Sequence, residues 1–374
     1  MVIKNKKIRY VLQDLELFFK KIIIRLFLKP CAKKTLTELK ISGVKKLLLI
    51  RQHDPLGDII LSTAVFKNIN TALPGAVIDV ITRPDIKQVF DGNRYIRKIF
   101  IFDKNNYYNP FSFIKIRKTL KKEKYDLVLV LGTTSISFFS LWLAKATRAE
   151  FRAGISGSFY GKKDYTEAFL SVELPYSGGA RHQTEKNLDI LRGVGLPSKN
   201  TSLYMETTAE EDSRASALFV RFGLKKGDKI VGFHCGAGKL ENRWPACNFA
   251  AVSDHLVRQN GMKAVLFSGI NEKELNNTFL KSAQEKVTVI PALNLREFAA
   301  AVKKITLLIC NDTGVLHIAA AVNTKTLAIF GPTDPAQWNP LDEGHFYVKS
   351  ENDNIFKVKT EEVIEIAGKA LKVF

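Results

Sequence analysis

The chain has 374 residues, enough for two domains of ordinary size, and its hydrophobic (46%) and charged (25%) fractions are those of a globular protein. These fractions exclude a disordered or fibrous chain. Charge is the outlier, because 57 basic and 37 acidic residues give a formal net charge of +20. Such a surface attracts phosphorylated small molecules, anionic membranes or nucleic acid, and composition alone does not choose among them.

Cysteine and histidine spacings show no disulfide framework and no metal motif. The four cysteines lack a C-x-x-C pair, and the six histidines include no H-x-x-x-H pair, so no protein-built metal site is predicted. Cys235 and Cys310 stand at the ends of apolar runs. We therefore predict buried free thiols and a reducing compartment.

Residues 1–40 are basic and contain an apolar stretch, 15–28, that charges interrupt. A membrane-spanning helix needs about 20 predominantly apolar residues, and a signal peptide needs an unbroken apolar core, so neither is predicted. We expect an amphipathic N-terminal helix. Two placements stay open: the helix lies in a membrane interface beside anionic headgroups, or it docks on the protein with its lysines solvated.

Strand-like and helix-like segments alternate along the rest of the first half. Apolar runs predict strands at 46–51, 76–82, 97–102 and 126–132, and helical periodicity predicts helices at 59–72 and 181–192. The basic, aromatic segment 104–124 is a solvated helix or a surface that faces an acceptor or a membrane. Residues 154–179 are polar and glycine-rich, which predicts loops near a cleft.

A hinge is predicted after residue 200, with a short strand at 203–206 and a helix at 209–222. The second half then predicts strands at 228–234, 263–268, 287–290, 305–310 and 326–330, and a last helix at 361–373 with Thr360 as its N-cap. This alternation indicates an α/β fold of two doubly wound, Rossmann-like domains that face a cleft. The predicted boundaries are 1–40, 41–200, 201–355 and 356–374, the last being a C-terminal helix.

The most informative stretch follows the strand 305–310. There Asn311, Asp312, Thr313 and Gly314 lead directly into a helix of small residues. Unpaired N–H groups and the positive end of the helix dipole make such a junction an anion cradle. The alternative is an ordinary strand–helix junction, with Asp312 or Thr313 as N-cap and Gly314 as a turn residue. The next strand also ends in a glycine loop, at Gly331, so both loops belong to the ligand-binding carboxyl edge of a parallel sheet.

Further candidate sites follow other strands of the chain. Gly236-Ala237-Gly238 allows a phosphate to approach the backbone, although it is no P-loop and a plain glycine turn explains it equally well. Arg243 stands at the start of a helix, with Pro245 at the first helical position, and an anion between the arginine and the helix dipole would remove their repulsion. Trp244 is interpreted as a packing residue.

Two carboxylates complete the candidate set. Glu272 lies at a distance past the glycine loop at which an acid commonly accepts ribose hydroxyls, and a solvated glutamate is the competing interpretation. Asp58 follows Gly57 at a helix start behind the first strand.

With these residues assembled, the chain resembles the lipopolysaccharide heptosyltransferase family, glycosyltransferase family 9, from about Lys46 to Pro340. Three blocks carry the resemblance, at 56–64, 236–245 and 311–340. The resemblance implies a GT-B fold and inverting transfer of a heptose or related sugar from a nucleotide diphosphate sugar, usually ADP-heptose. The implied acceptor is a lipopolysaccharide core or related lipid-linked oligosaccharide. The implied place is the anionic inner face of the bacterial cytoplasmic membrane, reached from the cytoplasm.

The resemblance also implies roles for individual residues. Asp58 would be the general base that takes the acceptor's proton, with helix capping as the structural alternative. The first-half domain would bind the acceptor and the second-half domain the nucleotide sugar, and no metal or other cofactor is expected because a helix start replaces it. The implied donor-binding residues are Gly57, Gly236, Ala237, Gly238, Arg243, Glu272, Asp312, Thr313, Gly314 and His317.

One departure from the family pattern concerns position 242. The family usually has Lys-Arg-Trp-Pro in the second block, whereas this chain has Asn242 before Arg243. Either Arg243 or Lys239 supplies the missing charge, or activity is reduced, or the donor differs. The alternative function is therefore a non-catalytic or different-donor nucleotide-sugar-binding relative in surface polysaccharide assembly. Nucleic-acid binding is suggested only by the net charge, and no motif supports it.

Overall fold

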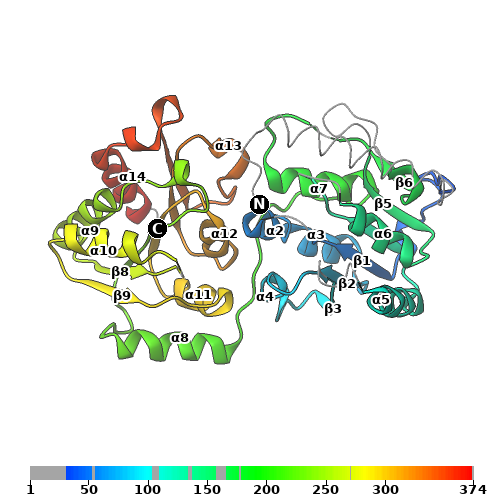
Figure 1. Ribbon diagram of the computed structural model, residues 1–374, viewed down its shortest axis with the longest axis horizontal. Coiled ribbons are helices and arrows are strands. Elements are labelled where there is room, and N and C mark those ends of the chain that lie inside the picture. Colours follow the sequence, from blue (N-terminus) through cyan, green and yellow to red (C-terminus); the bar gives the residue numbers. More distant parts are fainter. Residues whose placement is uncertain are drawn as a thin grey trace.

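The computed structural model describes residues 31–52, 55–102, 109–133, 137–156, 166–176, 178–269 and 271–372. Within these ranges the chain forms two six-stranded parallel sheets, one from each half, with helices packed around them (Figure 1). The predicted fold class, two doubly wound α/β units, is confirmed. The predicted domain boundaries stay predictions.

The first sheet has the strand order β3-β2-β1-β4-β5-β6, and every pair in it is parallel. Its strands are β1 (Lys46–Ile50), β2 (Val77–Thr82), β3 (Ile96–Ile101), β4 (Leu127–Val130), β5 (Phe151–Ile155) and β6 (Val172–Leu174). The helices of this half are η1 (Ile41–Gly43), α2 (Leu56–Leu61), α3 (Ala64–Ala72), α4 (Lys87–Phe90), α5 (Pro110–Glu123), α6 (Phe138–Ala146), η3 (Thr166–Ala168) and α7 (Gln183–Gly193).

The second sheet has the order β12-β11-β10-β7-β8-β9 and is also parallel throughout. Its strands are β7 (Ile230–His234), β8 (Lys263–Phe267), β9 (Val287–Ile290), β10 (Leu307–Asn311), β11 (Thr326–Phe330) and β12 (His345–Lys349). The helices of this half are α8 (Ala209–Arg221), η4 (Leu240–Asn242), α9 (Ala246–Asn260), α10 (Lys273–Ser282), α11 (Leu295–Val302), α12 (Gly314–Ala321), α13 (Pro335–Trp338), η5 (Glu351–Asp353), η6 (Ile355–Lys357) and α14 (Thr360–Lys372).

Both sheets follow the Rossmann order, in which the first and fourth strands of a unit are neighbours at its centre. The strand order reverses at β1/β4 in the first sheet and at β7/β10 in the second. Doubly wound sheets bind their ligands outside the carboxyl ends of the strands at this point. The fold therefore predicts one functional loop cluster after β1 and another after β7 and β10.

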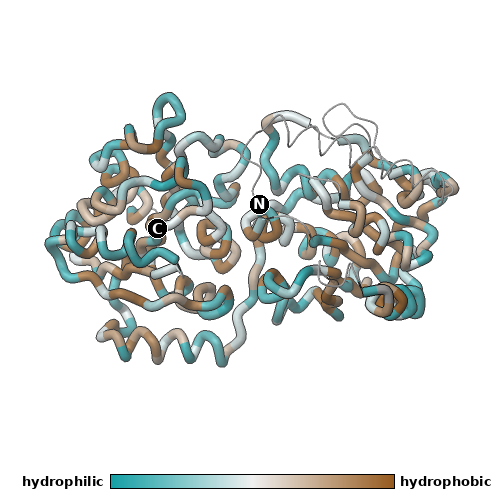
Figure 2. Tube along the Cα trace, in the orientation of Figure 1, coloured by the Kyte–Doolittle hydropathy of each residue, from teal (hydrophilic) through white to brown (hydrophobic). Residues whose placement is uncertain are grey.

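The central strands are apolar along their whole length because both of their faces are covered. In β1, Leu47 and Leu49 join one hydrophobic core while Leu48 and Ile50 join another on the opposite face. The core on the Leu47 side is continuous across both halves of the molecule and includes Leu308 of β10. In Figure 2 the most hydrophobic stretches of the tube follow the strands, whereas α8 alternates hydrophobic and hydrophilic residues.

The helix predicted at 59–72 is two helices, α2 and α3, that break at Ser62 and Thr63. Both hydroxyls donate hydrogen bonds to carbonyls three residues earlier, Ser62 to Ile59 and Thr63 to Ile60, at 2.6 Å each. Side-chain hydrogen bonds of this kind compete with the helical ladder. The Thr63 hydroxyl oxygen also accepts the N–H of Tyr204 at 2.9 Å, which fixes the connection between the halves.

Several other predicted elements differ from the structure. The described part of the N-terminal segment, residues 31–40, contains turns and no helix, and the helix predicted before it lies outside the described residues. The strand predicted at 203–206 is extended chain without a ladder, although the Met205 N–H bonds the Ala321 carbonyl at 3.0 Å. The loop region predicted at 154–179 contains the end of β5 and all of β6. β12 was not predicted because only one of its five side chains is buried.

A buried guanidinium fastens the two halves beside α8. Arg296 of α11 donates two hydrogen bonds to the Glu211 carboxylate, at 2.5 and 2.6 Å. It also donates to three main-chain carbonyls, those of Asp91 (2.5 Å), Gln88 (3.2 Å) and Glu206 (2.8 Å). The guanidinium holds the pKa of Glu211 down, to about 2. This cluster of Arg296, Glu211 and the three carbonyls, called the clasp below, thus joins α11 to α8, to the connecting segment and to the end of α4.

Replacing Arg296 with methionine leaves a partly buried carboxylate and three carbonyls without their donor. We expect Arg296→Met to lower the free energy of unfolding by about 3 kcal/mol, measured by urea unfolding at pH 7.5. The matched control is Arg258→Met, which removes an exposed pair with Glu285 and should cost under about 1 kcal/mol. Equal losses in the two variants would show that the clasp contributes no more than a surface ion pair.

Candidate active site

Asp58 lies in the first turn of α2, directly behind β1, with its side chain buried. The N-cap position belongs to Pro55, and Asp58 is an acid of the first turn of the helix. The buried guanidinium of Arg51 fixes this turn, because it donates to the carbonyl of Asp58 at 2.9 Å and to that of Leu131 after β4. The first turn of α2 is therefore tied to both central strands of the first sheet.

The start of α12 faces the start of α2. A Cβ atom added to Gly57 would lie 2.9 Å from Cδ2 of His317, and one added to Gly314 would lie 3.0 Å from Cδ2 of Leu56. Both glycines thus allow a close approach of the two helix starts, and neither has the positive φ of a turn glycine. This contact brings Asp58 of the first half next to the predicted anion cradle of the second half.

Thr313 occupies the N-cap position of α12 without a side-chain capping hydrogen bond, and Gly314 is the first helical residue. Thr313, Gly314 and Asp312 are half-buried rather than sealed in the core. Burial raises the pKa of Asp312, while neighbouring Thr333 and Lys239 act in the opposite direction. The first N–H groups of α12 therefore open onto the junction between the halves.

His317 lies one turn into α12 and is buried against Gly57. Burial, followed by the proximity of His182 and His345, lowers the pKa of His317 to about 3. The imidazole is therefore neutral at physiological pH. Its Nδ1 has no hydrogen-bond partner within the described part of the chain.

Buried Asn311 connects the three loop segments that the sequence singled out in the second half. Its amide donates to the Cys235 carbonyl at 2.8 Å, and its side-chain oxygen accepts the N–H of Trp244 at 3.0 Å. Asn311 itself is the residue before Asp312, so one side chain holds the loops after β7, before α9 and after β10 together. Asn311 was named in the predicted cradle without a role of its own, although a polar residue at the end of an apolar strand is an unusual feature.

Glu272 packs directly on the glycine loop after β7. A Cβ atom on Gly236 would lie 1.6 Å from Oε1 of Glu272, so a side chain at that position would displace the Glu272 carboxylate. The Glu272 carboxylate accepts the N–H of Gly269 at 3.1 Å and lies 3.4 Å from Nε2 of His234. Gly236 and Glu272 are therefore neighbours in one cluster, as a shared donor site requires.

Arg243 and Asn242 are turned toward different groups. Arg243 donates through Nε to the Ala237 carbonyl at 2.8 Å, so it shapes the loop that ends at exposed Gly238. Asn242 is buried and its amide reaches Oδ2 of Asp312 at 3.4 Å.

Trp244 is fully buried and donates to the Val358 carbonyl at 3.0 Å, which confirms it as a packing residue. Pro245 is the N-cap of α9 and not its first helical residue.

Helix α7 adds two residues that sequence analysis did not identify. His182, its N-cap, accepts the Thr184 N–H through Nδ1 and bonds the Asn339 carbonyl of the second half at 2.8 Å through Nε2. Lys186 lies one turn later and is buried where α7 packs on α2. Burial lowers the pKa of Lys186, and the charge of Asp58 acts against that change.

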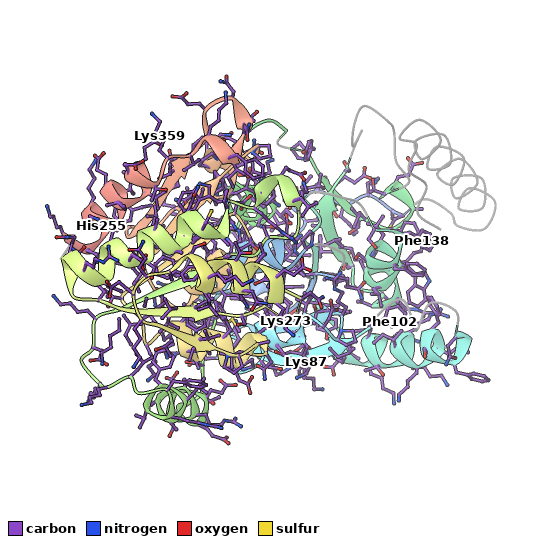
Figure 3. The ribbon with its side chains drawn as sticks, turned by 60° about the vertical axis from the view of Figure 1, so that its left-hand side comes forward. Lys87, Phe102, Phe138, His255, Lys273 and Lys359 are labelled. Carbon is purple, nitrogen blue, oxygen red and sulfur yellow. The ribbon has the colours of Figure 1, made fainter. Side chains whose placement is uncertain are left out.

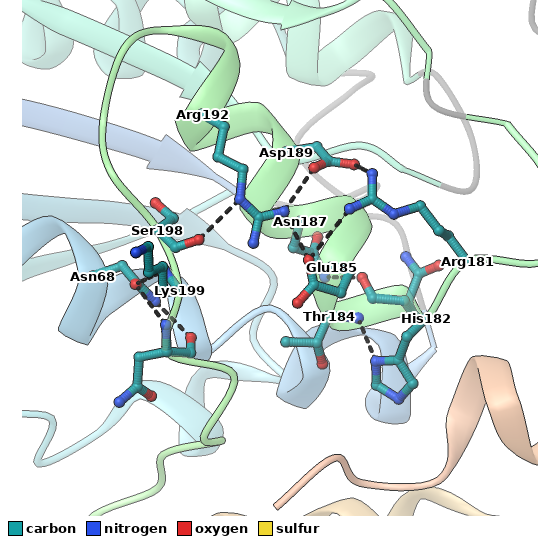
Figure 4. A network of polar contacts seen from close by, with 12 residues as sticks. Asn68, Arg181, His182, Thr184, Glu185, Asn187, Asp189, Arg192, Ser198 and Lys199 are labelled. Carbon is teal, nitrogen blue, oxygen red and sulfur yellow. Dashed lines mark hydrogen bonds and ion pairs between the residues drawn. The ribbon is translucent and has the colours of Figure 1, made fainter.

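Ion pairs and main-chain hydrogen bonds hold α7 in place (Figure 4). Arg192 pairs with Glu185 and Asp189 at 2.7 Å each and donates to the Ser198 carbonyl at 2.9 Å. Asn68 of α3 accepts the Lys199 N–H at 3.1 Å in the same view. The ion pairs lie within α7, and the bonds to Ser198 and Lys199 fix the chain that leaves the helix toward the second half.

The arrangement is two Rossmann switch points in contact, with a buried carboxylate on one side and a helix start beside a glycine loop on the other. The family model for glycosyltransferase family 9 (heptosyltransferase) matches residues 113–366, about two thirds of the chain. The chain belongs to glycosyltransferase family 9. This family 9 member is therefore a glycosyltransferase.

Individual relatives agree with this assignment. The chain is 27% identical to lipopolysaccharide heptosyltransferase 3 of Escherichia coli over 76% of this chain and 83% of the relative. It is 24% identical to lipooligosaccharide heptosyltransferase 2 of Haemophilus influenzae over 81% of this chain and 88% of the relative. Most of the length of both relatives is therefore covered.

Solved structures show that the family 9 protein has the fold of its relatives. A glycosyl transferase family 9 protein from Veillonella parvula superimposes with a TM-score of 0.77 at 23% identity, covering 87% of this chain and 97% of that one. The ADP-heptose LPS heptosyltransferase II of E. coli gives a TM-score of 0.70 at 20% identity, covering 87% and 98%. At these identities the likeness establishes the GT-B fold and not the substrates.

Two features predicted as absent can be examined within the described ranges. In them, no three His, Cys, Asp or Glu side chains gather as a metal-binding group. No helix in this part of the chain has both the length and the apolarity needed to cross a bilayer. All four cysteines, Cys31, Cys235, Cys247 and Cys310, are free thiols, and Cys235 and Cys310 are buried as predicted.

The buried histidine at the junction makes stability depend on pH. An imidazole in the unfolded chain titrates near about 6.5, whereas His317 in the fold titrates near 3. The unfolded chain therefore binds more protons between these values, and the free energy of unfolding falls as the pH drops through about 6.5. The free energy of unfolding of the wild type should therefore fall between pH 7.5 and pH 5. In His317→Gln, which lacks the titrating group, this fall should be smaller by about 2 kcal/mol. The measurement is urea unfolding at both pH values, and the same loss in both proteins would contradict it.

Proposed function

We propose that the protein transfers a heptose or a closely related sugar, with inversion, from a nucleotide diphosphate sugar to a lipopolysaccharide core or related lipid-linked glycan. ADP-heptose is the first donor to test. The observation that carries this proposal is the packing of Gly57 on His317, which places Asp58 beside the start of α12. The curated relatives named above are heptosyltransferases by name, and one E. coli neighbour of the same fold, heptosyltransferase WaaC, was solved with ADP.

In the proposed reaction Asp58 removes the proton from the acceptor hydroxyl as that oxygen attacks the anomeric carbon. A carboxylate is a stronger base when water is excluded, and the Asp58 side chain is only 6% exposed. Lys186 lies on the neighbouring helix, where its positive charge favours the ionised form of Asp58. The proposed base is thus a buried carboxylate with a cation on the neighbouring helix.

The leaving nucleotide diphosphate is proposed to lie against the N–H groups of Thr313 and Gly314 and the glycine loop at 236–238. Amide dipoles and a helix start stabilise a developing anion without rearranging during the reaction. We propose that these groups act without a metal ion. Glu272, packed on Gly236, is the proposed partner of the ribose hydroxyls.

The proposed place of action is the inner face of the bacterial cytoplasmic membrane, where a lipid-linked acceptor is held. The net charge of +20 supports attraction to an anionic membrane surface. The same charge gives no reason to expect nucleic acid as a partner, because no nucleic-acid-binding motif accompanies it.

The decisive test of the base is Asp58→Asn, which keeps the shape of the side chain and removes its basicity. We expect single-turnover transfer from radiolabelled ADP-heptose to fall at least about 100-fold, while the dissociation constant for ADP changes less than about threefold. Both proteins are assayed with and without EDTA, which should leave transfer unchanged. Unaltered transfer by Asp58→Asn would refute the assignment.

Donor binding without transfer by the wild type would instead favour the alternative, a non-catalytic nucleotide-sugar-binding relative. A thermal-shift screen of nucleotide diphosphates and their sugars then identifies the preferred donor, since a ligand that binds only the folded state raises the melting temperature.

The charge that the family lysine would supply is proposed to come from Lys239. Lys239 is exposed and acts on Asp312 electrostatically, whereas Arg243 is engaged with the Ala237 carbonyl. We expect Lys239→Gln to raise the dissociation constant for ADP-heptose about tenfold, the loss of one charge-assisted hydrogen bond, with no change in melting temperature. The control is Lys226→Gln, an exposed lysine before β7. Equal donor affinities in the two variants would exclude Lys239.

A further inference from the structure

Helix α5 presents two large apolar side chains to solvent near its start. Phe111 is 79% exposed and Ile114 is 52% exposed. The opposite side of the helix packs into the first-half core through Ile116 and Leu120, which are buried. Phe111 and Ile114 are three residues apart and therefore neighbours on one face.

The exposed face of α5 is also strongly basic. Its cations, all exposed, are Lys115, Arg117, Lys118, Lys121 and Lys122. None of them forms an ion pair with any residue that the structure describes. The acid of this helix, Glu123, is bound by Lys46, Arg97 and Lys98, which hold its pKa down, to about 2. The positive charge of the face is thus not neutralised from within the helix.

The apolar end of this face lies at the carboxyl edge of the first sheet. Phe113 of α5 meets Phe102, the residue after β3, with ring centroids 5.4 Å apart. Gln52, just after β1, donates to the Phe102 carbonyl at 2.6 Å. Figure 3 shows Phe102 and Phe138 at the same end of the first half. The start of α5 is therefore on the sheet edge that also carries Asp58.

We propose that the exposed face of α5, formed by Phe111, Ile114 and the five cations, docks on an anionic lipid bilayer. The docking itself does not depend on the proposed function. Only its role rests on that function, namely to bring a lipid-linked acceptor to the sheet edge that carries Asp58. A helix that lies in a membrane interface buries large apolar side chains below the headgroups and sets its lysines among the phosphates. The charge of the face matches an anionic leaflet, where each nearby cation strengthens binding.

A simple solvated basic helix accounts for the lysines but not for the two apolar side chains among them. Single exposed apolar residues are common on protein surfaces. Here two of them share one face with five cations that pair with no acid among the described residues, and this combination is the composition of an interfacial helix. The bilayer is therefore the occupant that uses both features at once.

Vesicle flotation of the full chain tests the proposal. The vesicles contain phosphatidylcholine with or without phosphatidylglycerol. Two variants are compared with the wild type. The first combines Phe111→Ser and Ile114→Ser, and the second combines Lys115→Gln, Lys118→Gln and Lys122→Gln. We expect each variant to partition to the anionic vesicles roughly tenfold more weakly, or weaker still. Melting temperatures confirm that each variant is folded.

A matched control removes the same kinds of side chain from the second half. Phe356 is 66% exposed and lies beside the exposed Lys357 and Lys359. Phe356→Ser with Lys357→Gln and Lys359→Gln should leave partition within about twofold of the wild type. Unchanged partition of the α5 variants, or an equal loss in the control, would overturn the proposal, because other basic segments would then account for binding.

A second readout reports insertion directly. In Phe111→Trp, the emission of the new indole should shift to the blue on anionic vesicles and be quenched by brominated lipids, while Phe356→Trp should show neither change. If the emission of Phe111→Trp is unaffected, and the lysine variant also loses binding to a soluble polyanion, the face is a general anion site and the bilayer proposal is wrong.

Transfer assays separate this proposal from the proposed function. The α5 variants should transfer sugar to a water-soluble acceptor fragment at the wild-type rate and to a vesicle-embedded acceptor more slowly. Failure to detect transfer with any donor would refute the proposed function and leave the flotation and fluorescence results to decide the role of α5.

Discussion

The structure depends on one contact, the packing of the start of α2 against the start of α12. Gly57 permits it, because a Cβ atom there would lie 2.9 Å from Cδ2 of the His317 ring and would push the ring away. The same contact buries His317 and keeps its imidazole neutral. It also closes a hydrophobic core that runs from β1 to β10. The relation between the two halves, and the placing of Asp58 beside the start of α12, therefore follow from a few atoms at one junction.

Each half contributes to that junction by the same construction. A buried polar side chain near the end of a central strand fixes the loops that follow it: Arg51 after β1 and Asn311 at the end of β10. Both satisfy main-chain carbonyls that would otherwise be buried without donors. Loops held in this way keep their geometry when the ligand is absent, which reduces the free energy spent on ordering them during binding. The carboxylate and the helix start are thus set by the sheets and not by the substrate.

Much of the fold could be predicted because the central strands, covered on both faces, are continuous apolar runs. β5, β6 and β12 were missed. β6 and β12 lie at sheet edges, and β12 buries only one side chain, whereas β5 lies inside the sheet but carries an arginine and a glycine that interrupt its apolar run. The loops around Gly236 and Asp312 were found from their glycines, and the structure brings them together. The polar residue at the end of an apolar strand marks Asn311 as unusual, but its partners lie 67 and 76 positions away, and sequence spacing does not identify them. Lys186 carries no such mark, and its proximity to Asp58 follows only from the packing of the helices.

The neutral residue at position 242 changes how charge is distributed around the donor loop. A lysine there would meet the Asp312 carboxylate directly, whereas Asn242 offers only its amide at 3.4 Å. Burial already raises the pKa of Asp312, and the cation that acts against this is the exposed Lys239. His317 adds no positive charge, because its imidazole is neutral. A diphosphate entering this site would therefore draw Lys239 away from Asp312 and favour protonation of that carboxyl. In the proposed donor site, donor affinity and the ionisation of Asp312 would in this way be coupled through Lys239.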